Sequence, residues 1–467
     1  MGSFTEISIM KHNRKYALLS SIIMKKYTRR GKRMKHLFYG GVHPADKKEL
    51  SSGVALQRLE KPKQVIIPMS QHIGSPCKPL VKVGDVVKKG QKIGEGEGLC
   101  VPVHASVSGK VVAVEPRRHP NGSQVLSVVI ENDFKGTLDT SMTAYEDYSA
   151  LSNDEIIKII REAGIVGMGG ATFATSIKAA IDAKIDTLIA NACECEPYIT
   201  ADDMLLRTNP QQVIEGMKII AQVVKPERMV LAIEDNKKEA IAVMKKLLAN
   251  ESRIELRVFP TRYPQGAERQ LVQAVTGREI IPGQLPSSVG CVVFNVATYE
   301  ATYRAVCLGK PITGRIVTVT GEAVKKPGNF IVPIGMPVDE LLEAAGGLTE
   351  DVWKVINGGP MMGLAQPDTK TVVIKGTNAV LCLSNAQNGE SANQTCIRCG
   401  KCLGVCPTRL QPLYMYAYGK QNDVEALKRF RVLDCIECGS CAYECPGKLP
   451  LVEQFRLGKK LVREAMK

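Results

Sequence analysis

Residues 396–407 read CIRCGKCLGVCP, and the same pattern returns as CIECGSCAYECP over residues 435–446. In each run three cysteines stand three positions apart, and a fourth follows four positions later, directly before a proline. Three thiolates at that spacing can wrap one face of a cubane iron–sulfur cluster, while the proline turns the chain so that the fourth thiolate projects away. The two runs therefore predict a pair of [4Fe–4S] clusters and decide the fold of the C-terminal part of the chain.

The ligand sets are expected to cross between the two runs. In two-cluster ferredoxins with this spacing, the fourth cysteine of each run ligates the other cluster. This assigns one cluster to Cys396, Cys399, Cys402 and Cys445, and the other to Cys435, Cys438, Cys441 and Cys406. Zinc sites and disulfides are the competing interpretations, but structural zinc often uses two separated pairs of ligands, which a doubled run of four does not resemble.

The segment 411–434, between the runs, is longer than in a minimal ferredoxin. We expect it to form helices that pack against the clusters and shield them from water. Seven cysteines lie outside the runs and are expected to be ordinary buried or half-buried thiols: Cys77, Cys100, Cys193, Cys195, Cys291, Cys307 and Cys382.

Length and charge limit the kinds of partner. The chain has 467 residues, enough for about three or four domains, and a formal net charge of +15. Ten Lys or Arg and a single acid lie in residues 1–36. Residues 1–35 are therefore a basic extension: a solvated tail, a lipid-facing arm, or an artefact of start-site choice before Met34. One Trp and nine Phe offer few stacking platforms, so we expect no nucleic-acid partner. No apolar run reaches the roughly 18 residues that span a bilayer, so we expect no transmembrane segment.

Residues 36–135 predict short strands joined by regular turns. The pattern VKVGDVVKKGQKIGE, followed by VHASVSGKV, resembles a lipoyl- or biotinyl-type barrel-sandwich hybrid. Carriers of that type attach their cofactor to a Lys at a hairpin tip, whereas the tip here, Val103–Ser106, has none. We therefore reject a swinging-arm carrier and keep the fold as a docking module. His104 is interpreted as a turn residue rather than a ligand.

The rest of the chain predicts a multidomain α/β and α+β protein. Residues 136–305 alternate helical and strand patterns, which indicates a Rossmann-like domain with a largely parallel sheet. Its strands are expected at 187–191 and 229–233, and its helices at 153–163, 209–224 and 237–250. Residues 306–380 resemble the small β-grasp module called SLBB. Residues 381–467 form the helical two-cluster domain and end in a short basic helix.

A glycine-rich stretch, residues 164–175, stands between two predicted helices. Glycines let backbone amides approach a phosphate, although a turn used only for packing has the same composition. Three further segments, 191–198, 263–269 and 294–298, follow predicted strands of the α/β domain. Ligands bind at the carboxyl ends of strands in such sheets, so the four segments predict one binding site.

Together these segments resemble the FMN- and NADH-binding subunit of respiratory complex I, the 51-kDa type. That family has a glycine loop G-x-G-G-A-x-F-P-T and a Lys on the next helix. The matching residues here are Gly167, Gly169, Gly170, Ala171, Phe173, Thr175 and Lys178, with Ala174 in place of Pro. The other segments match at Asn191, Glu194, Glu196, Pro197, Tyr263, Gly266, Glu268, Asn295, Val296 and Thr298, with Ala267 in place of a Glu.

The resemblance implies roles for these residues. The glycine loop and Lys178 would hold the FMN phosphate, and Asn191, Asn295 and Thr298 would bind the flavin. Phe173 would stack on NADH, which Glu196 and Glu268 would help to position. A Lys on a solvated helix face and Glu residues that cap helices are the alternatives. No catalytic acid or base is expected, because the reaction needs only alignment of nicotinamide with flavin.

From about residue 36 onward, the order of modules resembles that of RnfC, a subunit of the Rnf complex. The stretches GGVHP, PGQLPSSVGCVVFNVAT and NGGPMMG carry this likeness. It implies a peripheral subunit at the cytoplasmic face of the cell membrane. That subunit would move electrons between NAD(H) and ferredoxin through FMN and two [4Fe–4S] clusters, coupled to Na+ or H+ transport. A microcompartment cobalamin reductase and a scaffold with relic motifs are the alternatives. The direction of flow, the coupling ion, the redox potentials and the choice of NADH over NADPH stay open.

Overall fold

The computed structural model describes residues 38–59, 61–389 and 395–467. Phe38 to Lys467 form one compact unit, and the basic extension expected for residues 1–35 lies outside the described residues. Within the described part of the chain, every helix is too short or too polar to cross a membrane.

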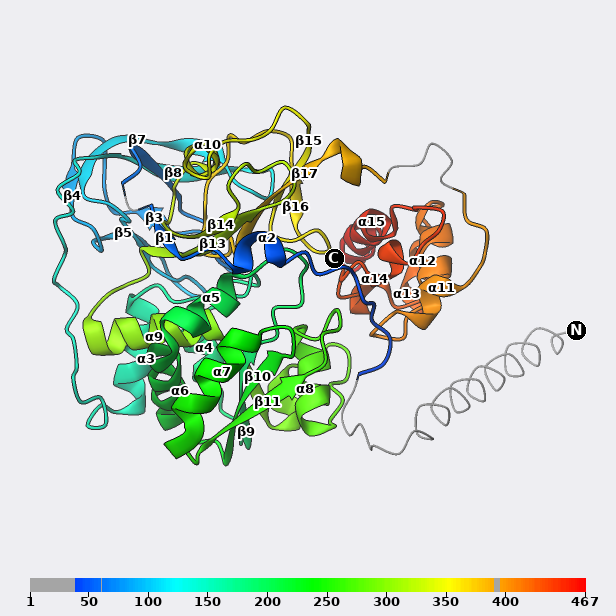
Figure 1. Ribbon diagram of the computed structural model, residues 1–467, viewed down its shortest axis with the longest axis horizontal. Helices are drawn as coiled ribbons and strands as arrows, with labels where there is room; N and C mark the ends of the chain where they lie inside the picture. The colour runs from blue at the N-terminus through cyan, green and yellow to red at the C-terminus, as the bar shows by residue number, and fades with distance from the viewer. Residues whose placement is uncertain (1–37, 60, 390–394) are drawn as a thin grey trace, which may run out of the picture. The chain divides into compact units, whose positions relative to one another are not determined.

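Two small β-sheets make up the barrel-sandwich part (Figure 1). The larger is antiparallel and consists of β2 (Gln64–Pro68), β8 (Gln124–Asn132), β7 (Gly109–Arg118) and β4 (Val86–Val87). The smaller consists of β3 (Lys78–Pro79), β5 (Lys92–Glu95) and β6 (Val103–His104). Their inward side chains form one apolar core. His104, expected in a turn, lies in β6 with a 3% exposed side chain, because the hairpin tip packs against Gly164 of the next domain.

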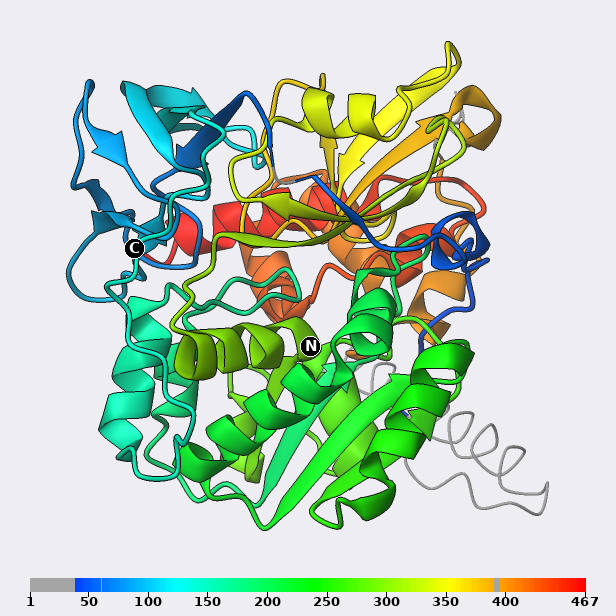
Figure 2. The same ribbon diagram turned by 60° about the vertical axis from the view of Figure 1, so that its left-hand side comes forward.

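A four-stranded, fully parallel sheet follows, as predicted. Its order is β11 (Ile254–Phe259), β10 (Arg228–Glu234), β9 (Thr187–Ala192) and β12 (Cys291–Asn295). Helices α6 (Pro210–Val224), α7 (Lys238–Leu247) and α9 (Val296–Leu308) pack on one face, and α8 (Glu268–Thr276) packs on the other. Figure 2 shows these helices around the green strands. Burial on both faces explains why the strands are continuously apolar.

Three short helices surround the glycine-rich stretch and the ends of this sheet: α3 (Asn153–Glu162), α4 (Thr175–Ala179) and α5 (Ala201–Thr208). Helix α3 begins at the predicted residue. The Ser152 hydroxyl accepts from the Glu155 amide at 3.3 Å, and the Glu155 carboxylate accepts from the Ser152 amide at 2.8 Å. This reciprocal capping box fixes where the helix starts.

The β-grasp part is a six-stranded mixed sheet. Its order is β1 (Gln57–Arg58), β14 (Gly328–Pro333), β13 (Gly314–Thr320), β17 (Ala379–Ser384), β15 (Val352–Asn357) and β16 (Leu364–Gln366). Helix α10 (Val338–Ala344) contributes to its apolar core. Strand β1 lies ahead of the barrel strands in sequence but pairs with β14. The segment 38–59, with its helix α2 (Glu49–Ser52), thus packs outside the barrel sheets, and the domain boundaries drawn from sequence stay a prediction.

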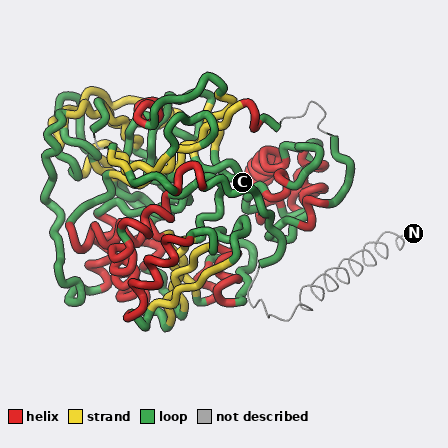
Figure 3. Tube along the Cα trace, in the orientation of Figure 1, coloured by secondary structure: helices red, strands yellow, loops and turns green. Residues whose placement is uncertain are grey.

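The described residues 395–467 are helices and loops (Figure 3). They form α11 (Lys401–Gly404), α12 (Pro412–Gly419), α13 (Val424–Arg429), α14 (Ser440–Tyr443) and α15 (Leu451–Glu464). Helices α12 and α13 are those expected between the cysteine runs, and α15 is the terminal helix. Their core joins apolar side chains such as Met415 and Phe455 to Cys406 and Cys441.

Candidate functional site

A closed loop presents the glycine-rich segment to solvent. Val166 and Ala174 form an isolated antiparallel bridge, and the Gly167 amide donates to the Phe173 carbonyl at 2.8 Å. The tip of the loop is exposed. Gly170 there has a φ of 105°, and a Cβ at this position would meet no atom within 4 Å. An open glycine tip is the kind of backbone concavity that binds phosphate.

The loop rests on the first turn of α9. A Cβ on Gly169 would stand 3.3 Å from the Asn295 Cβ, so the backbones approach closely. The Asn295 side chain caps α9 by accepting from the Ala297 amide at 2.9 Å. The Thr298 hydroxyl, which is buried, accepts from the Met168 amide at 3.0 Å. Two predicted flavin-binding residues thereby hold the glycine loop in place.

The carboxyl ends of β9 and β12 meet the turn before α8 beside this loop. The Asn191 amide donates to the Gly266 carbonyl at 2.9 Å. Lys178 on α4 forms an ion pair with Glu268 on α8, and its ammonium lies 5.4 Å from the centre of the Phe294 ring. Segments far apart in sequence thus come together as predicted, with the proposed phosphate-binding Lys paired to a proposed nucleotide-positioning Glu.

Buried charges stand behind this edge of the sheet. One Glu194 oxygen accepts from the Asp202 amide at 2.8 Å, and the other has no hydrogen-bond partner among the described residues. The Asn295 amide donates to the Asp202 carboxylate at 2.6 Å. Burial and then the neighbouring Glu194 raise the pKa of Asp202 to about 7. Burial and then Lys237 lower the pKa of Lys48 to about 8. Groups with such shifts lie disproportionately at functional sites.

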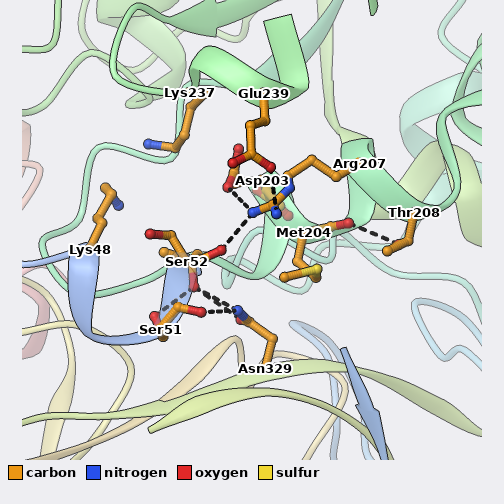
Figure 4. A network of polar contacts seen from close by, with 12 residues as sticks. Lys48, Ser51, Ser52, Asp203, Met204, Arg207, Thr208, Lys237, Glu239 and Asn329 are labelled. Atoms are coloured by element: carbon orange, nitrogen blue, oxygen red, sulfur yellow. Dashed lines mark hydrogen bonds and ion pairs between the residues drawn. The ribbon is translucent and has the colours of Figure 1, made fainter. Parts of the chain in front are cut away.

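Lys48 reaches this site because a polar network ties its segment down. Figure 4 shows Arg207 of α5 donating to the Ser52 carbonyl, at 2.6 Å, and pairing with Glu239 of α7, also at 2.6 Å. The Asn329 amide of β14 donates to the Ser51 carbonyl at 3.3 Å. Helix α2 is therefore fixed between the α/β domain and the β-grasp sheet. Sequence reasoning missed Lys48, Lys237 and Asp202, since no local pattern marks them.

Glu196 serves a different contact from the one expected. Its carboxylate accepts from the Met361 amide at 3.1 Å and from the Met362 amide at 2.9 Å. Burial raises the pKa of Glu196 to about 7, although these two amides oppose the shift. The side chain thus connects the α/β domain to the turn at NGGPMMG in the β-grasp part.

A polar cavity of about 280 Å³ adjoins the glycine loop near Met168 and the start of α9. Its wall includes two acids, Asp202 and Glu300, and five cationic residues: Arg58, Lys89, Arg304, Lys310 and Arg315. The excess of cations suits an anionic group on this side of the loop.

Tyr263 connects the α/β domain to the second cysteine run. Its side chain is buried, and its hydroxyl donates to the backbone carbonyl of Cys438 at 2.6 Å. The backbones of Val42 and Tyr263 exchange hydrogen bonds of 2.8 and 3.0 Å, and the Gly41 amide donates to the Val405 carbonyl at 2.8 Å. The segment GGVHP therefore runs between the α/β domain and the cluster-binding loops.

The structure brings together the two crossed sets of cysteines. One cavity is lined by Cys396, Cys399, Cys402 and Cys445, with apolar Leu413, Leu449 and Leu451 around them. Burial and then these three sulfur neighbours raise the pKa of Cys402 to about 11. In the second set, burial and then Cys438, Cys435 and Cys406 raise the pKa of Cys441. Mutual repulsion of this kind is relieved when an iron cluster binds the thiolates.

The backbone repeats between the two runs at an offset of 39 residues. Arg398 and Glu437 both have positive φ, at 54° and 56°, and Gly400 and Gly439 follow at 75° and 77°. The same left-handed turns then lead into α11 and α14. In the second run the Glu437 amide points at the Cys435 sulfur, at 3.4 Å. Paired turns with amides directed at sulfur fit cubane clusters, so the donor set and the backbone agree with [4Fe–4S].

Four family models match the chain. They are the RnfC barrel-sandwich hybrid domain over residues 36–135, the Nuo51 FMN-binding domain over 160–304, the SLBB domain over 316–365 and the 4Fe-4S dicluster domain over 390–446. Their combination defines an iron–sulfur flavoprotein of the oxidoreductase class.

Curated relatives specify the family within that class. The RnfC subunit of the Na(+)-translocating ferredoxin:NAD(+) oxidoreductase complex of Acetobacterium woodii is 46% identical over 388 residues, which cover 82% of this chain and 88% of that protein. The corresponding subunit of the proton-translocating complex of Clostridium ljungdahlii is 41% identical, with 85% and 88% covered. The same subunit of the ion-translocating oxidoreductase complex of Citrobacter koseri is 42% identical over 83% of this chain, which spans only 56% of that longer protein. The chain belongs to the RnfC family of Rnf complex subunits.

Proposed function

We propose that this chain is the nicotinamide-reacting subunit of an ion-translocating ferredoxin:NAD+ oxidoreductase complex. It moves electrons between NAD(H) and ferredoxin through FMN and two [4Fe–4S] clusters, and the complex couples this flow to Na+ or H+ transport. FMN, when bound, exchanges an electron pair with the nicotinamide and single electrons with the clusters. The chain lies at the cytoplasmic face of the membrane, bound to the other subunits of its complex.

The residues of the glycine loop edge divide the binding work in this proposal. Backbone amides at Gly169, Gly170 and Ala171 and the Lys178 ammonium hold the FMN phosphate, while Thr175 and Gly167 keep the loop closed. Asn191, Asn295 and Thr298 position the flavin, and Phe173 stacks on the nicotinamide nucleotide. Glu268 sets the position of Lys178 through their ion pair, and Gly266 admits the close approach that a side chain would block.

The buried carboxyls have a separate part. Glu194 has a carboxylate oxygen without a partner among the described residues, which leaves it free to accept from a bound ligand. Glu196 and Tyr263 act one step removed, since they hold the β-grasp turn and the cluster loop against the α/β domain. No side chain needs to act as a catalytic acid or base, because hydride transfer requires alignment of the two rings.

One observation carries the proposal: the hydrogen bond from Tyr263 to the backbone carbonyl of Cys438. It joins the nucleotide-binding segment directly to one cluster-binding loop. This supports the set of Cys406, Cys435, Cys438 and Cys441 as the cluster on the flavin side. The other set then faces the partner subunits, since Cys399 is exposed and the neighbouring Ile397 is 68% exposed.

Anaerobic reconstitution tests the proposal. The full chain, loaded with iron, sulfide and FMN, is mixed with NADH and examined by EPR at low temperature. We expect bleaching of the flavin absorbance together with signals of reduced [4Fe–4S] clusters. Cluster signals that appear with dithionite but never with NADH, in protein that holds FMN, would refute it. Zinc in place of iron in well-folded protein would refute it as well.

A further inference from the structure

Two cysteines outside the cluster runs meet in the core of the barrel-sandwich part. The Sγ atoms of Cys77 and Cys100 lie 3.2 Å apart, and the two residues are 4% and 3% exposed. They come from segments 23 positions apart, one just before β3 and one in the loop after β5. We propose that Cys77 and Cys100 form a reversible disulfide, an oxidative modification site separate from both clusters.

The surrounding backbone holds the two sulfurs in contact. The Cys77 amide donates to the Met69 carbonyl at 2.8 Å, and the Cys100 amide donates to the Gly98 carbonyl at 2.8 Å. Glycines on β5 and just after it leave the necessary space. A Cβ on Gly94 would stand 3.2 Å from the Cys77 Cβ, and one on Gly96 would stand 2.8 Å from the Cys100 sulfur. Closing the remaining gap to a disulfide bond of about 2.05 Å requires only a small side-chain movement.

A metal site is the competing interpretation of this place, because His72 completes a buried group of three candidate ligands. Both ring nitrogens of His72 are already engaged, however. Nε2 lies 2.9 Å from the Val101 amide, from which it accepts, and Nδ1 lies 3.2 Å from the Ile73 carbonyl. That pattern uses the lone pair that a metal would need. Structural zinc also takes four ligands, and this group supplies three. The geometry therefore favours the dithiol.

The oxidation balances with a small hydroperoxide as oxidant. One thiol attacks the peroxide oxygen, which gives a sulfenic acid and water. The second thiol then attacks the sulfenic sulfur, which forms the S–S bond and releases a second water. Burial raises the pKa of Cys77 to about 12, so the thiolate is scarce at neutral pH and the reaction is slow. Thiols stay reduced in most intracellular compartments, so the disulfide is an oxidative state rather than a permanent crosslink.

The pair lies directly behind the glycine loop. The Ile73 amide donates to the Thr172 carbonyl at 3.2 Å, and Thr172 belongs to the loop with a φ of 49°. The neighbouring His72 is bound to Val101, the residue after Cys100. A bond between Cys77 and Cys100 would brace both segments that support this contact. Oxidation is therefore expected to slow amide hydrogen exchange at Ile73 and Val101.

Peptide mapping of the full, cluster-loaded protein tests the inference. Anaerobically purified protein is treated with hydrogen peroxide for hours, alkylated with iodoacetamide under denaturing conditions and digested with trypsin without reductant. Cys77 and Cys100 then lie in separate peptides, residues 64–82 and 93–110, each with one cysteine. We expect these two peptides to appear linked after treatment, unlinked before it, and unlinked again after dithiothreitol.

The controls separate the disulfide from its alternatives. Cys77→Ser and Cys100→Ser, or Cys→Ala at either position, abolish the linked pair, whereas Cys382→Ser, which removes a buried thiol in β17, leaves it intact. Full alkylation of both peptides in treated wild-type protein, while half-buried Cys307 is oxidised in the same sample, would overturn the proposal. One equivalent of zinc or copper that requires Cys77, Cys100 and His72 would also overturn it, in favour of a metal site.

Discussion

Replacing Tyr263 with Phe removes the hydroxyl that donates to the Cys438 carbonyl at 2.6 Å. The ring stays, so the apolar contacts of Tyr263 with Val42 and Cys438 are kept. The carbonyl loses a partner in a buried place. Leaving a buried polar group unsatisfied costs about 1–3 kcal/mol. The cost falls on docking of the cluster loop against the α/β domain, because the bond crosses between them.

Hydrogen exchange in the cluster-loaded protein measures this cost. If exchange of the loop requires its release from Tyr263, the variant should speed exchange in residues 435–445 by about 5- to 150-fold, since about 1.4 kcal/mol is tenfold. Tyr299→Phe is a matched control, because the Tyr299 hydroxyl is equally buried and donates to the Ile189 carbonyl at 3.2 Å within the parallel sheet. That variant should speed exchange around β9 and leave the cluster loop unchanged.

The reasoning fails if Tyr263→Phe leaves exchange in residues 435–445 within twofold of wild type. It also fails if Tyr299→Phe speeds exchange there as much. The first outcome would mean that other contacts hold the loop, and the second that the loop responds to general loss of stability.

The remaining predictions concern the ligand sets, the flavin site, a buried carboxyl and the GGVHP segment. Cys445→Ser and Cys396→Ser should remove the same EPR signal, and Cys406→Ser and Cys441→Ser the other; loss that follows the order of the runs instead would refute crossed ligation. Lys178→Gln should raise the FMN dissociation constant by about tenfold, measured by fluorescence quenching, while Lys184→Gln, at an exposed lysine, should not change it. Burial raises the pKa of Glu196 from 4.5 to about 7, so folded protein binds an extra proton in that window and its stability falls as pH rises through it. Glu196→Gln should flatten this slope in denaturant titrations, and an unchanged slope would contradict the assignment. Gly41→Ala, whose Cβ would stand 2.5 Å from the Tyr263 carbonyl at a φ of +81°, should speed cluster loss to a chelator, while Gly53→Ala, with open space, should behave as wild type.

Features that depend on local spacing could be predicted from the amino-acid sequence alone. The two cysteine runs predicted both clusters and their sorting into crossed sets, because short loops leave few ways to arrange four thiolates around a cubane. The Ser152 capping box and the apolar runs of β9 and β10 likewise predicted their elements, since capping and two-sided burial leave a direct trace in composition. The glycine loop and the strand-end residues Asn191 and Asn295 were found in the same way.

The packing of the domains, in contrast, sets which distant groups meet. Lys48 lies beside Glu194 and Glu234, and Cys77 touches Cys100, although neither pair has a local pattern. His104, interpreted as a turn residue, is buried in β6 because a neighbouring domain covers the hairpin. Tyr263 and Glu196 matched a nucleotide-binding motif, yet their side chains contact a cluster loop and a β-grasp turn. Periodicity records which face of an element is buried, but the partner on that face depends on how whole domains pack, which no short stretch of sequence encodes.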